Sequence, residues 1–364
     1  MISVSVTHRQ GDFVLDAAFE AGEGVTSLFG PSGSGKTTLV QVIAGLLRPE
    51  RAKIIFDGTV WEDTAANIRV PPHRRRIGYV FQEGRLFPHL TAQQNLRYGR
   101  FFAPRGAKLL SEDEVISLLG IGHLLDQRPR TLSGGEKQRV AIGRALLAAP
   151  SLILMDEPLS ALDRARKQEI LPYIERIRDE IRLPIIYVSH AVEEVARLSN
   201  RVILLDEGRV GAAGTPAEVF PDIAHLPQSV APRSVLEGRI VGHEPGYHLS
   251  VAEIGAQIVT LNPVGLAVGA PVRITIPAED VVVSLRRPED ISALNCVSAT
   301  VTGIQRDAAH VTVIMDCEGQ LLLARVTLLS ADRLALRPGL EVFALFKAGT
   351  PAAGSLYQPS PVSG

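Results

Sequence analysis

The first two-thirds of the chain alternate short apolar runs with stretches of helical periodicity. Residues 25–29 have the pattern of a strand that runs into Gly30, and continuous apolar runs cover 152–155, 185–188 and 202–205. Runs that are apolar on both faces are typical of parallel strands that helices cover. Because these strands alternate with helices, the pattern predicts an α/β fold with a mostly parallel sheet.

Two stretches show how the helices are marked. Isoleucine and leucine recur at three- and four-residue spacing over 170–181, which predicts an amphipathic helix. Ser111 is followed three residues later by Glu114, and then by the apolar run 115–119. This is the pattern of a capping box, in which a serine and a glutamate satisfy the first free N–H groups of a helix. A helix is therefore expected to begin after Ser111.

The pattern changes near Thr215. Prolines punctuate 216–232, which predicts the end of a helix and a linker. Beyond it, apolar and polar residues alternate at 272–276, 297–302 and 310–313, and Gly and Pro recur between these runs. The C-terminal part is therefore predicted to be one small barrel-like all-β domain or a pair of them. Residues 235–288 and 291–348 are similar in length and could be related halves, although no residue-level repeat supports this.

Composition excludes several classes of protein. The 364 residues are 46% apolar and 21% charged, as in ordinary globular proteins, so extended disorder is not expected. A net charge of -1 gives no support for a nucleic-acid partner. Cys296 and Cys317 are too few for a disulfide scaffold. We see no signal peptide and no apolar run near the ~20 residues that span a bilayer. Work at a membrane would therefore require docking on a spanning partner.

The segment after the predicted strand 25–29 carries the clearest chemistry. It fits the phosphate-binding pattern G-x-x-x-x-G-K-[ST] between a strand and a helix. Glycines let backbone N–H groups surround a phosphate, and the helix N-terminus adds a positive dipole end. Lys36 would reach the β- and γ-phosphates of a nucleotide, and the Thr37 hydroxyl would hold Mg²⁺. The segment and the residue after it are Gly30, Pro31, Ser32, Gly33, Ser34, Gly35, Lys36, Thr37 and Thr38.

Two further motifs add to this nucleotide site. Asp156 and Glu157 end the apolar run 152–155, where one carboxylate can bind Mg²⁺ and the other can polarise an attacking water. Ser133, Gly134 and Gly135 open a second helix, with Ser133 as the expected N-cap. The bare glycine backbone at that N-terminus predicts a second anion site.

With these motifs in order, the chain resembles the ATPase subunits of ABC transporters. The further motifs that carry the resemblance are a glutamine loop, a D-loop, a switch histidine and the strand-turn that follows it. They lie at Gln82 after Tyr79-Val80-Phe81, at Ser160-Ala161-Leu162-Asp163, at His190 and at Asp206-Glu207-Gly208-Arg209.

The resemblance implies a role for each motif. Two copies would pack head to tail around two ATP molecules, and residues 133–135 of one copy would complete the γ-phosphate site of the other. The catalytic residues would be Glu157 as general base, His190, which holds the γ-phosphate and the base, and Gln82, which contacts Mg²⁺ or water. Asp156 would bind Mg²⁺ together with Thr37 and Gln82, and Asp163 would bridge the dimer.

One family feature departs from the usual pattern. These ATPases usually stack adenine on an aromatic residue upstream of the phosphate-binding loop. At that spacing the chain has Thr7-His8-Arg9, and the nearest aromatic residue is Phe13. The adenine contact is left open between His8 and Phe13.

Two stretches of sequence, the one around Gln82 and residues 132–147, resemble the ATPase of molybdate importers. Importer ATPases of this type carry a C-terminal β-domain, and residues 291–295 resemble the opening of a molybdate-binding (mop, or TOBE-type) barrel. Leu294 stands where that pattern usually has arginine, which places an oxyanion site in doubt. Ser292, Asn295 and Lys347 remain candidates for it. The arginine runs 74–76 and 286–287 are expected to be solvated faces.

The resulting hypothesis is an ATPase subunit that powers molybdate import. It would work as a homodimer at the cytoplasmic face of the inner membrane, with two permease subunits and an extracytoplasmic oxyanion-binding protein. Alternatives are a sulfate or tungstate importer, a soluble ABC protein of translation or DNA repair, and a molybdate-sensing regulator. The last two are disfavoured because the chain has one cassette without heptads and no DNA-binding helix pair. The predicted domains are an ABC ATPase at 1–232 with a helical subdomain at about 85–150, a linker and first β segment at 233–290, a mop/TOBE-type barrel at 291–352 and a tail at 353–364.

Overall fold

The computed structural model divides into two compact units, Met1–Ala213 and Gly214–Gly364. It describes residues 1–101, 103, 110–181, 183–221, 231–349 and 352–355. The predicted boundary at 232 lies inside the second unit, and part of the expected linker, 222–230, lies outside the described residues. Helix α7 (Pro216–Val219) begins in the proline-punctuated segment.

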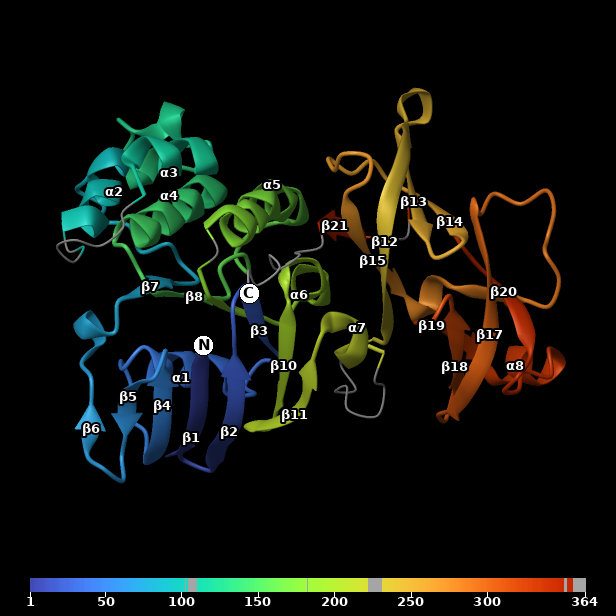
Figure 1. The fold of residues 1–364 in the computed structure, drawn as a ribbon, viewed down its shortest axis with the longest axis horizontal. Helices are drawn as coiled ribbons and strands as arrows, with labels where there is room; N and C mark the ends of the chain where they lie inside the picture. The colour runs from blue at the N-terminus through green and yellow to red at the C-terminus, as the bar shows by residue number, and fades with distance from the viewer. Residues whose placement is uncertain (102, 104–109, 182, 222–230, 350–351, 356–364) are drawn as a thin grey trace, which may run out of the picture. The chain divides into compact units, whose positions relative to one another are not determined.

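Unit 1 is built on a mixed sheet. In the described part of the chain its strand order is β6-β5-β4-β1-β2-β11-β10-β3-β9-β8-β7 (Figure 1). The strands are β1 (Ile2–Gln10), β2 (Phe13–Ala21), β3 (Val25–Phe29), β4 (Arg51–Phe56), β5 (Thr59–Asp63), β6 (Ile68–Arg69), β7 (Ile77–Val80), β8 (Leu152–Asp156), β9 (Ile185–Ser189), β10 (Arg201–Asp206) and β11 (Arg209–Gly214).

The four strands predicted from the sequence form the parallel part of this sheet. They are β3, β8, β9 and β10, and β7 extends the same part; residues of β3, β8 and β9 are buried throughout. The other half, β1, β2, β4, β5 and β6, is antiparallel. In β1, β2 and β4, buried residues alternate with more exposed ones over most of each strand, as expected for a sheet with one covered face. The prediction of an α/β fold with a parallel sheet is confirmed for these central strands, and the antiparallel half is an addition to it.

Helices cover the sheet and form a separate cluster of α2, α3 and α4 (Figure 1). This cluster lies between β7 and β8 in sequence and includes much of the predicted helical subdomain. The predicted capping box at Ser111 is present at the start of α3, and the predicted N-cap Ser133 is present at the start of α4, where it forms a capping box as well. The helices of unit 1 are α1 (Lys36–Ile43), α2 (Ala92–Phe101), α3 (Glu112–Leu119), α4 (Gly134–Leu147), α5 (Arg164–Arg176) and α6 (Val192–Leu198).

The expectation that residues 74–76 form a solvated face is wrong for Arg75. Its side chain is buried, and its guanidinium donates to the carbonyls of Val42 (3.0 Å) and Ile43 (2.8 Å), the last two residues of α1. It also donates to the Val70 and Trp61 carbonyls and pairs with the buried Glu62 carboxylate. Carbonyls at a helix C-terminus have no intrahelical partner, so Arg75 caps α1 from another part of the chain.

Unit 2 is all-β apart from short helices, as predicted. Its described strands form two five-stranded sheets, β14-β13-β12-β15-β21 and β16-β20-β17-β18-β19, over one shared apolar core. Strand β21 overlaps the predicted tail, whose residues 356–364 lie outside the described chain. The elements are β12 (Arg233–Glu244), β13 (Leu249–Ile254), β14 (Gln257–Leu261), β15 (Pro271–Pro277), β16 (Val282–Ser284), β17 (Asn295–Arg306), β18 (His310–Cys317), β19 (Gln320–Thr327), α8 (Leu328–Arg333), β20 (Glu341–Phe346) and β21 (Ala352–Ser355).

The two sheets of unit 2 are built alike. The order β14-β13-β12-β15 repeats as β19-β18-β17-β20, and β12 and β17 carry a register shift at the same place, before Gly242 and Gly303. Two glutamines at equivalent positions, the first residues of β14 and β19, also form hydrogen bonds between the halves. Gln320 bonds the Glu237 backbone, and Gln257 bonds Ser298. The hypothesis of related halves, which similar length alone could not support, is therefore supported by topology and hydrogen bonding.

Candidate functional site

The phosphate-binding loop joins the end of β3 to the start of α1. Gly33 and Gly35 adopt left-handed conformations, with φ of 84° and 96°. A Cβ on Gly30 would lie 2.0 Å from the Leu205 carbonyl oxygen, so only glycine fits there. Gly35 is the N-cap of α1 and offers no side chain to its N–H groups. The loop therefore leaves a helix N-terminus ready for an anion.

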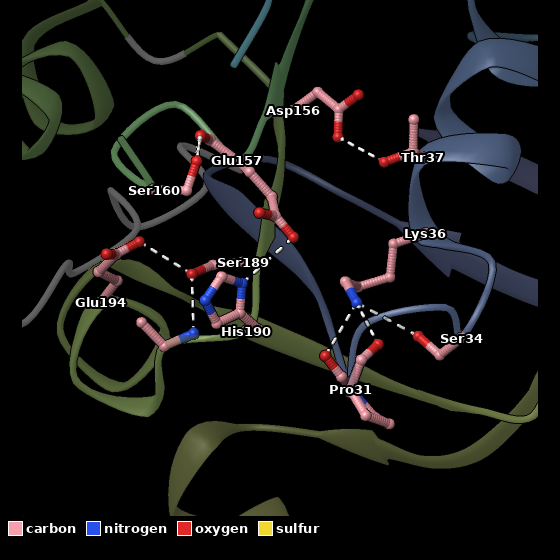
Figure 2. A network of polar contacts seen from close by, with 12 residues as sticks. Pro31, Ser34, Lys36, Thr37, Asp156, Glu157, Ser160, Ser189, His190 and Glu194 are labelled. Carbon is pink, nitrogen blue, oxygen red and sulfur yellow. Dashed lines mark hydrogen bonds and ion pairs between the residues drawn. The ribbon is translucent and has the colours of Figure 1, made fainter. Parts of the chain in front are cut away.

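Lys36 lies inside this loop and is 4% exposed. Its Nζ donates to the carbonyls of Gly30 (2.8 Å) and Pro31 (2.6 Å) and to Ser34 Oγ (3.3 Å) (Figure 2). Burial lowers the pKa of the Lys36 ammonium, and the nearby Glu157 and Asp156 carboxylates oppose that shift. The ammonium is thus held at the loop by neutral carbonyls, which an arriving phosphate can outcompete by its charge.

Asp156, at the end of β8, is the second buried charge of the site. Its Oδ1 accepts a hydrogen bond from Thr37 Oγ1 at 3.1 Å (Figure 2). Its Oδ2 accepts one from Tyr79 Oη at 3.0 Å. Burial raises the pKa of Asp156, and these two hydrogen bonds oppose the shift. A hydroxyl and a carboxylate in contact are the hard oxygen ligands that Mg²⁺ prefers, so these residues fit the ion.

Glu157 follows in a strained backbone conformation, with φ of 45°. Ser160 holds that conformation, because its N–H and hydroxyl donate to the Glu157 carbonyl at 3.2 and 2.9 Å. A non-glycine residue in the left-handed region persists only where its surroundings enforce it, and such residues cluster at functional sites. His190 Nδ1 lies 3.2 Å from Glu157 Oε1 (Figure 2). The two residues whose roles the sequence paired are therefore in contact.

Two cavities connect these residues. One of about 360 Å³ is lined by Ser32, Gly33, Gly35, Lys36, Thr37, Thr38 and Glu157, together with Gln10 and Phe13. Another, of about 520 Å³, brings Gln82 together with Thr37 and Asp156. These residues converge because β3, β7, β8 and β9 are parallel, so that their carboxyl ends meet at one edge of the sheet. The first cavity is lined by Phe13 and not by His8.

The remaining predicted residues lie elsewhere in the described chain. Ser133, Gly135 and Asp163 line neither of these two cavities. Ser133 caps α4, and Asp163 caps α5 through a 3.0 Å bond from the Arg166 N–H. Gly134 packs against the D-loop, since a Cβ there would meet Leu162 at 2.9 Å. Within one chain, the phosphate loop and the start of α4, where the sequence predicts a second anion site, line no common cavity among the two described above.

In the second unit, the three residues considered for an oxyanion site, Ser292, Asn295 and Lys347, do not form a polar cluster like that around Lys36. Asn295 is buried, and its side chain is used by the Thr260 backbone, which it bonds at 2.7 and 2.9 Å. Ser292 and Lys347 are exposed, and Leu294 is 60% exposed.

Sequence reasoning missed two kinds of residue around the site. The sequence places Tyr79 in the glutamine-loop motif but does not indicate that its hydroxyl donates to Asp156 from the neighbouring strand. Ser189 and Glu194 were not singled out, and they bond each other beside His190 (Figure 2). The available signal was position: each lies within four residues of a motif residue.

Comparison with known proteins agrees with this geometry. The ABC transporter family profile matches residues 15–160, and the TOBE domain profile matches residues 291–350. A solved structure of CbiO1 from Clostridium perfringens, part of an ABC transporter complex, superposes on 61% of this chain and 90% of its own. The TM-score is 0.51 and the sequence identity 29%. The chain is therefore an ATP-binding protein of the ABC transporter class.

Curated relatives narrow the class. The molybdenum import ATP-binding protein ModC of Rhizobium etli is 50% identical over 349 residues, which cover 94% of this chain and 97% of that protein. ModC of Mesorhizobium japonicum is 49% identical over 95% of this chain and 94% of its own length. The chain belongs to the ModC family of ABC transporter ATP-binding proteins. Across the described residues, no helix is both long and apolar enough to cross a membrane.

Proposed function

We propose that this chain is the ATP-hydrolysing subunit that powers molybdate import through an ABC transporter. The observation that carries the proposal is the convergence at one sheet edge of Lys36 in the phosphate loop, the Thr37–Asp156 pair and the Glu157–His190 pair. These are the groups that phosphoryl transfer to water requires: a phosphate cradle, oxygen ligands and a base. The molybdate assignment rests on the ModC relatives.

In this proposal the chain's residues divide the work as follows. The loop N–H groups and Lys36 bind the β- and γ-phosphates, and Thr37, Asp156 and Gln82 hold Mg²⁺. The ion supplies positive charge against the phosphate oxygens. Glu157 accepts a proton from the water that attacks the γ-phosphate, and His190 holds that carboxylate and the γ-phosphate in place.

We assign the adenine contact to Phe13. Its ring lines the cavity beside Gly35 and Lys36, and a Cβ on Gly35 would meet it at 3.0 Å. Aromatic side chains bind a base by stacking on its face. His8 is the weaker candidate, because it does not line this cavity in the described structure.

The second anion site supports a homodimer. Ser133, Gly134 and Gly135 line neither of the two cavities at the phosphate loop of their own chain. A second copy placed head to tail would bring them to its γ-phosphate. Asp163 would lie at that interface. Two permease subunits would dock near Gln82, which also lines a mainly apolar cavity of about 430 Å³ with Gly84, Leu86 and Gly134. The subunit would be peripheral at the cytoplasmic face of the membrane, and an extracytoplasmic binding protein would deliver the oxyanion.

The Glu157→Gln variant tests the hydrolytic role. The amide keeps the size of the side chain and loses the base, so the variant should bind ATP and remain a closed dimer. Light scattering with saturating ATP and Mg²⁺, together with phosphate release, measures both properties. A variant that stays monomeric and hydrolyses ATP at the wild-type rate would contradict the proposal.

The cargo is tested with the assembled transporter in proteoliposomes. Molybdate-loaded binding protein should stimulate ATP hydrolysis, whereas sulfate-loaded protein should not. Stimulation by sulfate or tungstate alone would keep the ATPase role and move the chain to another oxyanion importer.

A further inference from the structure

One hydroxyl group, that of Ser189, fixes the backbone around His190 by hydrogen bonds. Ser189, directly before His190, accepts a hydrogen bond at its Oγ from the Ala191 N–H at 3.0 Å. The same hydroxyl donates to Glu194 Oε2 at 2.8 Å (Figure 2). Ser189 is 3% exposed, while the His190 side chain is 48% exposed. Packing therefore constrains the imidazole weakly, and its direction depends on the backbone that Ser189 holds.

Glu194, in turn, is a buried carboxylate with three donors. It lies on α6 and is 4% exposed. Besides Ser189, its Oε2 accepts from Tyr187 Oη at 2.9 Å, and its Oε1 accepts from Lys167 Nζ at 2.8 Å. A buried carboxylate is costly unless such partners compensate it, and a satisfied network of this kind is rigid. Glu194 thus fixes the Ser189 hydroxyl.

Lys167 connects this network to α5. It lies four residues after Asp163, the N-cap of α5, and its N–H donates to the Asp163 carbonyl at 3.0 Å. A continuous path of hydrogen bonds therefore runs from the D-loop through Lys167, Glu194 and Ser189 to the backbone around His190. The path ends at Glu157, which His190 contacts at 3.2 Å.

We propose that Glu194 is a positioning residue for ATP hydrolysis: through Ser189 it sets the direction of His190 toward Glu157, and through Lys167 it ties that direction to α5 and Asp163. The inference rests on the proposed ATPase function. Glu194 touches neither nucleotide cavity, so its loss should misplace His190 without weakening the phosphate loop.

The test compares steady-state ATP hydrolysis of full-length variants. In Glu194→Gln the amide has one acceptor oxygen where the carboxylate has two, so it cannot serve both Lys167 and the hydroxyls. We expect kcat to fall about tenfold, as small misplacements at a reacting centre do, with KM for ATP within about twofold. Ser189→Ala should likewise lower kcat and leave KM for ATP nearly unchanged. Ser189→Thr keeps the hydroxyl and should have the wild-type kcat. Lys167→Met should lower kcat as well.

The matched control is Glu175→Gln. Glu175 pairs with Arg197 through two 2.8 Å bonds, and this pair joins the same two helices, α5 and α6, away from Ser189. The Glu175→Gln variant should keep the wild-type kcat. An equal loss of kcat in the control would mean that helix docking, not His190, is affected, and would overturn the inference. An unchanged kcat in Ser189→Ala would also overturn the inference. This variant provides the test if Glu194→Gln does not fold. A wild-type protein that hydrolyses no ATP would instead contradict the proposed function.

Discussion

At the residue scale, the site brings together two buried charges and one residue with a left-handed backbone conformation. Lys36 and Asp156 are buried charges, and Glu157 has a strained backbone. Each is held by named neighbours rather than by solvent: carbonyls for Lys36, two hydroxyls for Asp156 and Ser160 for Glu157. Burial without full charge compensation costs stability, and such costs are usual where a ligand supplies the missing charge.

The Asp156→Asn variant tests this cost. Burial raises the pKa of Asp156 in the folded chain above its unfolded value. Such a group favours folding below its unfolded pKa, and that contribution is lost as pH rises through the folded pKa. Near pH 7 the nucleotide-free variant should therefore melt at a higher temperature than wild type. The difference should vanish as pH falls below the ordinary aspartate range. Thermal melts across pH measure this, and a lower melting temperature near pH 7 would contradict it.

At the element scale, the C-terminal end of α1 is fixed by a distant part of the chain. Its N-terminus is the phosphate loop, and its last carbonyls are bound by Arg75, which precedes β7. A Cβ on Gly45, just after the helix, would lie 2.9 Å from the Arg75 guanidinium. The phosphate-binding helix is thereby tied to the strand that leads to Gln82.

Replacing Arg75 should therefore destabilise the chain strongly. Arg75→Met leaves the buried Glu62 carboxylate without its partner, and breaking a buried pair costs about 3–5 kcal/mol. The control is Arg74→Met, whose side chain belongs to an exposed residue and should change stability by less than about 0.5 kcal/mol. Urea unfolding of nucleotide-free protein measures both. Equal effects of the two substitutions would contradict the cap assigned to Arg75.

Most central elements could be predicted from local patterns, because their cause is local. The apolar run at 152–155 needs burial on both faces, and Ser133 and Ser111 carry their own caps. Arg75 and Glu194 could not be predicted, since a charged residue is buried only when partners from other elements satisfy it. The duplication in unit 2 was hidden for a similar reason: Ser234 and Asn295 hold equivalent backbone positions with different side chains.

At the scale of the whole molecule, the chain has two units with separate apolar cores. The clusters of Met1–Ala213 and of Gly214–Gly364 share no residue in the described chain. The residues of the proposed nucleotide site all belong to the first unit. Ligand binding raises the stability only of the structure that binds it, by about 2.7 kcal/mol at one hundred times Kd.

Trp61 gives a direct readout of this division. It is the single tryptophan of the sequence, and it is buried in the first unit. ATP with Mg²⁺ should raise the unfolding midpoint seen by tryptophan fluorescence. A calorimetric transition of the second unit should stay in place. Lys36→Ala, which removes the phosphate-binding ammonium, should abolish the fluorescence shift. A single transition that moves as a whole with ATP would contradict the separation.

The most direct test of the account is oxyanion uptake by cells that lack this gene. Labelled molybdate and sulfate are supplied at low external concentration, and the strain is complemented with wild type or with Glu157→Gln. We predict that molybdate uptake alone is lost on deletion and that only wild type restores it. Uptake of molybdate that continues unchanged without the gene would contradict the proposed function.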